Sequence, residues 1–130
     1  MRYSILCVCM TLWAASTRDG VFTKEQADRG KAVYAETCAT CHGADLAGTD
    51  RIPPVGGSGF LKRWEGANLG ELYQRISKGM PRDKPESLTA RQYSDVSAYM
   101  LSFTGFPAGK DEMAADGDAL ESIKIQLPSK

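Results

Sequence analysis

Two cysteines and the only histidine of the chain stand together in the run Cys38-Ala39-Thr40-Cys41-His42. At this spacing two thiols can add to the two vinyl groups of a haem, while the adjacent imidazole reaches the iron from the same side. The run therefore predicts one covalently attached haem. A large apolar cofactor would also fill the middle of a chain whose 130 residues, 13 of them glycine, bury only a thin core.

Three other uses of such a cysteine pair are alternatives: a disulfide, a redox-active dithiol and half of a zinc site. A zinc site needs two further ligands nearby, yet His42 is the only histidine. A thioredoxin-like dithiol is expected after a strand, whereas the residues before Cys38 have a helical pattern. Haem attachment is the favoured interpretation.

The first sixteen residues have the pattern of a secretory signal peptide. A positive start at Met1-Arg2 is followed by an apolar stretch from Tyr3 to Trp13 and by the small residues Ala14-Ala15-Ser16. We expect cleavage near Ser16, removal of Cys7 and Cys9 with the leader, and a periplasmic mature protein. The alternatives are an uncleaved anchor, for which the apolar stretch is short, and a lipoprotein with Cys9 as the acceptor.

Composition and charge exclude some classes of partner. Basic and acidic residues number 16 each, so the chain is neutral overall and nucleic acid is not an expected partner. A hydrophobic share of 42% is ordinary for a soluble protein, and we expect no membrane span in the mature chain. The length predicts a single domain.

Three segments carry helix signals. The first begins with a capping box at Thr23–Gln26 and runs to about Ala39. The second follows Asn68, has an amphipathic pattern and ends near Gly79. The third opens at Thr89 and is stopped by Gly105 and Pro107. Residues Gly43 to Gly59 are predicted to be loop, and no segment shows the alternation of a strand, so the fold should be all-α.

Together these features resemble the class I, or mitochondrial-type, cytochromes c over roughly Gln26 to Phe103. Gly30 and Tyr34 precede the first cysteine by eight and four residues, as do a glycine and an aromatic residue in that family. There the first helix crosses the last, and Val96 and Tyr99 look like the partners; a glycine allows such a close approach. The resemblance implies the cytochrome c fold, with three to five short helices wrapped around one covalently bound haem.

The expected organisation has three parts: a signal peptide over residues 1–16, a cytochrome c domain over 17–104 and a C-terminal extension over 105–130. The extension reaches beyond the region of resemblance. It carries the apolar residues Ile123, Ile125 and Leu127 near its end.

A methionine is the expected second axial ligand, because a single histidine cannot ligate both faces of the iron. Met80 is the predicted ligand: it follows a helix and precedes Pro81, which holds its backbone extended and leaves its side chain free. It also resembles the methionine loop of the family. Met100 lies on an apolar helix stripe and Met113 in a polar tail. An open, five-coordinate iron is the remaining alternative.

Three further residues are candidate haem contacts. The family holds its histidine ring with a proline carbonyl, and Pro53 occupies that place here, with Pro54 as the alternative. Val55 is expected to touch the haem. The Trp64 indole is expected either to donate to a haem propionate, as an aromatic residue does in the family, or simply to be buried.

The resemblance implies a monohaem carrier of single electrons and not an enzyme, because two axial ligands leave the iron no free position. Its partners would be a redox donor and acceptor; small cytochromes of this kind suggest a quinoprotein dehydrogenase and a terminal oxidase. One alternative is a fixed subunit of a dehydrogenase or oxidase, favoured by the apolar residues of the extension. The other is a five-coordinate haem protein that binds a gas or reduces peroxide.

Charge placement predicts how a partner would dock. From Lys62 to Lys84 six basic residues stand against three acidic ones, and from Gly105 onward three basic against five acidic. We therefore expect a dipole, with Lys78, Arg82 and Lys84 around the haem edge beside the methionine loop. The alternative is a solvated loop whose charges only maintain solubility.

Overall fold

The computed structural model describes residues 16–129, which form helices and no strand. The all-α prediction is confirmed, although the described residues hold six α-helices where three to five were expected. Two of these, α2 and α6, are single turns. The elements are η1 (Thr17–Asp19), α1 (Lys24–Thr37), α2 (Ala39–His42), α3 (Gly57–Trp64), α4 (Leu69–Gly79), α5 (Ala90–Thr104) and α6 (Gly117–Leu120).

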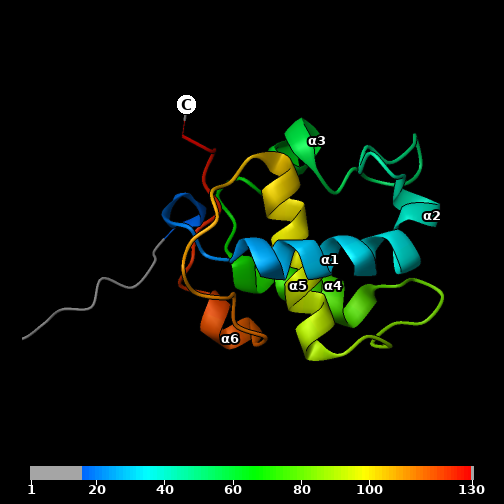
Figure 1. The fold of residues 1–130 in the computed structure, drawn as a ribbon. Coiled ribbons are helices and arrows are strands. Elements are labelled where there is room, and N and C mark those ends of the chain that lie inside the picture. The colour runs from blue at the N-terminus through cyan, green and yellow to red at the C-terminus, as the bar shows by residue number, and fades with distance from the viewer. Residues whose placement is uncertain (1–15, 130) are drawn as a thin grey trace, which may run out of the picture.

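Helices α1 and α5 cross at the centre of the molecule (Figure 1). At the crossing, a Cβ on Gly30 would overlap the backbone carbonyl of Asp95 and lie 3.0 Å from the Tyr99 Cβ. Only glycine permits this approach. Beside it, the rings of Tyr34 and Tyr99 pack edge to face with centroids 5.5 Å apart. The predicted crossing is confirmed, with Asp95 as a contact that the sequence did not indicate.

The predicted helix starts are also confirmed. Asn68 caps α4 and Thr89 caps α5, each in a reciprocal capping box with the third residue of its helix. Thr23 caps α1 by accepting from the Gln26 N–H. These side chains satisfy backbone donors that a helix start otherwise leaves unpaired.

One half of the capping box predicted at Thr23 is wrong. The Gln26 side chain does not return to Thr23; it is fully buried and donates to the Ser94 hydroxyl and the Met113 carbonyl, at 3.0 and 3.2 Å. Its carbonyl oxygen accepts from the Met113 N–H at 2.7 Å. The amide turns inward because it pairs with a buried segment of backbone.

The loop predicted from Gly43 to Gly59 is wrong at its end, where α3 begins at Gly57. Phe60 of this helix is completely buried, and the Gly57 N–H donates to the Thr104 hydroxyl of α5 at 3.1 Å. The helix is therefore fixed by tertiary contacts. Its glycine-rich start gives no local signal for a helix.

The C-terminal segment packs back onto the helices. Met113, predicted to lie in a polar tail, is 2% exposed, and Leu120 and Ile125 are buried as well. Near its end the chain lies between residues 66–69 and η1: Ile125 donates to the Ala67 carbonyl at 2.8 Å, and Thr17 donates to the Lys124 carbonyl at 3.0 Å. These backbone bonds join the two ends of the described chain.

Figure 1 shows these two ends on the same side of the molecule, with α2 and the loop after α4 at the opposite side. The predicted signal peptide lies outside the described residues except for Ser16, which caps η1. Within residues 16–129 no helix has the length and apolar character needed to cross a membrane.

Candidate haem site

The run from Cys38 to His42 forms a tight helical turn directly after α1. Cys38 closes α1 by donating its N–H to the Tyr34 carbonyl at 2.9 Å. Cys41 and His42 then donate to the Cys38 carbonyl at 3.2 and 3.0 Å. Residues three and four positions apart in a helix share a face, so the two thiols and the imidazole project from one side of this turn.

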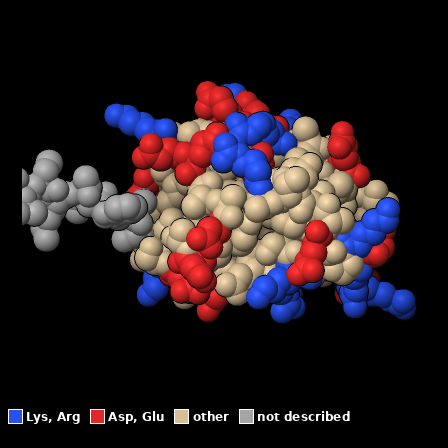
Figure 2. All heavy atoms as spheres, turned by 90° about the horizontal axis from the view of Figure 1, so that it is seen from below, with Lys and Arg blue, Asp and Glu red and all other residues tan. Residues whose placement is uncertain are grey.

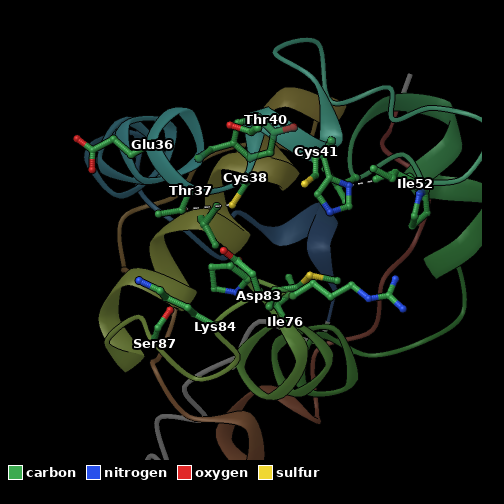
Figure 3. A pocket seen from close by; sticks show the side chains of 18 of the residues that line it. Glu36, Thr37, Cys38, Thr40, Cys41, Ile52, Ile76, Asp83, Lys84 and Ser87 are labelled. Atoms are coloured by element: carbon green, nitrogen blue, oxygen red, sulfur yellow. Dashed lines mark hydrogen bonds between the residues drawn. The ribbon is translucent and has the colours of Figure 1, made fainter.

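A cavity of about 810 Å³ lies beside the turn. Figure 3 shows Cys38 and Cys41 on one side of it and Ile76, Asp83 and Lys84 across from them. Six of the seven predicted site residues line the cavity: Cys38, Cys41, His42, Pro53, Val55 and Met80. The folded chain thus gathers into one place residues that stand up to about forty positions apart.

The ring of His42 is oriented by a hydrogen bond to the Pro53 carbonyl. The imidazole is buried, and its Nδ1 lies 2.9 Å from the Pro53 carbonyl oxygen. A carbonyl only accepts, so Nδ1 is the donor of this hydrogen bond, and Nε2 is the ring nitrogen left to ligate a metal. A ring fixed in this way by a carbonyl is the usual arrangement of a metal-ligating histidine.

Pro54, the alternative to Pro53, serves another purpose. A Cβ on Gly59 would lie 2.8 Å from the Pro54 Cβ, so this proline packs against the start of α3. Val55 donates its N–H to the Leu46 carbonyl at 2.9 Å and lines the cavity. Three adjacent residues of the loop therefore have different contacts: Pro53 with the histidine, Pro54 with α3 and Val55 with the cavity.

Two of the three candidate methionines line the cavity. Met80 caps α4 in an extended conformation, as the proline after it predicts, and its N–H donates to the Ile76 carbonyl at 2.9 Å. Met100 also lines the cavity from α5 and is buried. Met113 lies against Gln26 and Ser94 and is absent from the residues that line the cavity.

Trp64 is not brought to the cavity. It lies at the end of α3, partly buried and packed against the hydrophobic core, and is missing from the residues that line the cavity. Of the two expectations for this residue, simple burial matches these surroundings better than a contact with a haem propionate.

The donor set fits a haem. The cavity offers two thiols, which are free in the structure, a lone pair on an oriented imidazole, a thioether at Met80 and apolar walls at Ile52, Ile76 and Val96. Within residues 16–129 no three His, Cys, Asp or Glu side chains are grouped so that they could hold a metal ion by themselves. In this part of the chain, the further ligands that the zinc alternative needs are not gathered around the cysteine pair.

Burial shapes the electrostatics of the site. It raises the pKa of the Cys38 thiol, whereas a redox-active dithiol needs a lowered pKa. Burial also raises the pKa of Tyr34 to about 12, so this cavity-lining phenol stays neutral and donates to the Gly43 carbonyl at 2.5 Å. The rim carries both signs of charge: Glu36, Arg51, Arg82, Asp83 and Lys84.

Some lining residues were not predicted as site residues. Ile76 precedes Met80 by four positions on α4, and Ile52 directly precedes Pro53, so proximity to a predicted site residue was the available signal. Val96 was identified only as a crossing partner of α1. Tyr34 had the same assigned role, and nothing in the sequence indicated that both also face the cavity.

Comparison with known proteins agrees with this geometry. Residues 25–100 match the protein family described as cytochrome c oxidase, cbb3-type, subunit III. The chain belongs to this family of cytochrome c domains. The domain is an electron-transfer domain and not itself an enzyme, as predicted, and the family implies that this chain binds haem.

Individual relatives are larger proteins. A thiosulfate dehydrogenase of Psychrobacter arcticus is 32% identical over 110 residues, covering 75% of this chain and 32% of the relative. A cbb3-type cytochrome c oxidase subunit FixP of Bradyrhizobium diazoefficiens is 28% identical over 105 residues, covering 71% and 35%. The chain therefore spans about a third of the length of these curated relatives.

A solved structure supports the fold. The sulfane dehydrogenase SoxCD of Paracoccus pantotrophus contains a chain that superimposes with a TM-score of 0.56 at 18% sequence identity. The match covers 95% of this chain and 66% of the other. At this identity the likeness shows the cytochrome c fold alone, which confirms the predicted fold class.

Proposed function

We propose that this chain is a periplasmic monohaem c-type cytochrome that carries single electrons between redox proteins through a His/Met-ligated iron. The observation that carries the proposal is the single cavity in which the thiols of Cys38 and Cys41, the oriented ring of His42 and the thioether of Met80 meet. Each of these groups has a separate role in holding one haem.

Cys38 and Cys41 would attach the haem covalently. Each thiol adds across a vinyl double bond: the sulfur bonds to one vinyl carbon, and the thiol hydrogen goes to the other. His42 would ligate the iron through Nε2 and Met80 through Sδ. When bound, the haem supplies an iron that alternates between the ferrous and ferric states.

Two features of the chain suit electron transfer. With His42 and Met80 both bound to it, the iron would have no open position for oxygen or a substrate. The soft thioether of Met80 and the apolar walls favour ferrous iron, the first because of its softness and the second because an apolar wall disfavours added charge. We therefore expect a fairly high reduction potential.

The location and partners are inferred from sequence. The leader-like residues 1–16 support export to the periplasm. The relatives include a thiosulfate dehydrogenase and an oxidase subunit, which supports a dehydrogenase as the electron donor and a terminal oxidase as the acceptor.

Carbon monoxide binding tests the axial ligands. Ferrous wild-type protein should bind carbon monoxide slowly or not at all, because Met80 occupies the site. Met80→Ala should bind it readily and show a lowered potential. Met100→Ala is the matched control, since Met100 also lines the cavity. If wild type bound carbon monoxide as readily as Met80→Ala, the open-iron alternative, a gas sensor or peroxidase, would replace the carrier.

A fixed subunit of a larger complex is the second candidate, because one of the relatives is a subunit of a cbb3-type cytochrome c oxidase. The apolar residues of the extension support it less than expected. Ile125 is fully buried in this chain's own fold, and Leu127 is the member that stays exposed, at 42%. Co-purification with a membrane or periplasmic complex separates the two candidates.

A further inference from the structure

The loop that follows Met80 needs support from outside itself. All side chains from Arg82 to Ser87 are exposed. In Figure 1 the loop leaves α4 and turns back into α5 at the end of the molecule that carries α2. An exposed loop of this kind opens at low cost in free energy, unless buried contacts at its base hold it closed.

Tyr93 supplies such a contact. It lies in the first turn of α5 and is 3% exposed. Its hydroxyl donates to the Met80 carbonyl at 2.6 Å and accepts from the Leu88 N–H at 3.4 Å. One buried hydroxyl therefore connects the backbone at both ends of the loop, and ties both ends to α5.

We infer that Tyr93 is a positioning residue for Met80, an inference that rests on the proposed ligation of the iron by this methionine. The hydroxyl fixes the main chain from which the Met80 side chain enters the cavity. Removal of the hydroxyl leaves a buried carbonyl without its donor and frees the loop to move. The thioether then spends more time away from the iron.

The test is Tyr93→Phe, which keeps the ring and deletes only the hydroxyl. The probe is imidazole added to the ferric protein, because it binds only when Met80 has left the iron. Its apparent affinity rises in proportion to the fraction of molecules with the ligand detached. We expect roughly tenfold tighter binding, as the loss of one buried hydrogen bond implies. The methionine-to-iron charge-transfer band should weaken in parallel.

Tyr73→Phe is the matched control. Tyr73 is also a buried tyrosine, 7% exposed, and its hydroxyl lies 3.3 Å from the carbonyls of Ala90 and Ala115, to which it donates. It is missing from the cavity lining. Both variants should lose thermal stability, but only Tyr93→Phe should bind imidazole more tightly. If Tyr93 had a purely structural role, the imidazole affinity would change by the same factor in both variants.

The outcomes distinguish this inference from the proposed function. If wild type lacks the methionine band and binds imidazole as tightly as Met80→Ala, Met80 is not the ligand. Both the proposed ligation and the positioning role of Tyr93 are then wrong. If wild type shows the band but Tyr93→Phe binds imidazole as weakly as wild type, the positioning role alone is overturned. Tyr93→Leu also lacks the hydroxyl, so its apparent affinity for imidazole must rise as well. If Tyr93→Phe yields no haem protein, the imidazole affinity of Tyr93→Leu decides the question.

Discussion

The carboxylate of Glu112 fastens the C-terminal segment to the crossing helices. Arg29 donates to it at 2.6 and 2.8 Å, and Arg91 lies 2.9 Å away. Both arginines also pair with Asp95, whose side chain is 5% exposed. The hydrogen bond from Arg29 holds the pKa of Glu112 below its ordinary value, while the bonds to Asp95 and Glu112 raise the pKa of Arg29.

This arrangement predicts a pH-dependent contribution to stability. Because the folded pKa of Glu112 is lowered, its stabilisation is present above the ordinary pKa of 4.5 and is lost as the pH falls through the folded value. Glu112→Gln should lower the melting temperature at pH 7, and its difference from wild type should vanish in acid. Thermal unfolding between pH 7 and 3 measures this. Asp111→Asn, at the exposed neighbouring residue, is the control; an equal difference at every pH would contradict the prediction.

At the level of residues, the sequence predicted the contact for which the family resemblance supplies a partner. Pro53 follows His42 by eleven residues, and the family resemblance pointed to their pairing before the 2.9 Å contact was known. Gln26 and Tyr93 were missed as interior hydrogen-bonding groups. Their partners are the backbones of Met113 and Met80, and packing of separate segments brings these groups together. The pattern of apolar and polar residues along one segment does not reveal which segment packs against it.

The crossing of α1 and α5 is the element on which the fold depends most directly. Gly30→Leu should force the two backbones apart and lower the free energy of unfolding by about 1 to 3 kcal/mol through overpacking. Chemical denaturation of both proteins measures the difference.

Ala32→Leu is the control for that variant, because Ala32 is exposed on the same helix. It should leave stability within the small range typical of surface changes. Unchanged stability in Gly30→Leu would show that α1 and α5 do not approach as closely as the structure has them.

The three helices of eleven or more residues, each with a capping side chain, were predicted, whereas α3, which has no capping side chain, was not. Caps at Thr23, Asn68 and Thr89 located α1, α4 and α5. Helix α3 starts among glycines and is fixed by Phe60 in the core, while α6 is a single turn. Tertiary packing determines whether such elements form, so local helix propensity could not predict them.

At the scale of the whole molecule, one face carries charge that is less segregated than a dipole along the sequence suggests. Figure 2 shows basic and acidic side chains interspersed on one face, with uncharged surface between them. At the cavity, Arg82 and Lys84 line the rim together with Glu36 and Asp83, whereas Lys78 is absent from the lining. Docking through the basic residues of the methionine loop stays a prediction.

Salt-dependent kinetics test that prediction. Replacing Lys78, Arg82 and Lys84 together by Glu should slow electron transfer to the physiological partner at low ionic strength and leave the visible spectrum unchanged. The triple change of Lys62, Lys110 and Lys124 to Glu alters net charge equally, away from the cavity lining. If both triple variants slowed equally, net charge and not a docking site would explain the effect.

The proposed electron-carrying role depends on the covalent attachment of haem at Cys38 and Cys41. The direct measurement is haem staining after denaturing electrophoresis, with the intact mass as a second readout, on protein made in a host that assembles c-type haem. Wild type and Cys7→Ser/Cys9→Ser should keep one haem on the polypeptide, because the attachment uses only the later pair. Cys38→Ser/Cys41→Ser should lose it. Haem that leaves the denatured wild-type chain, or that stays on Cys38→Ser/Cys41→Ser, would contradict the account.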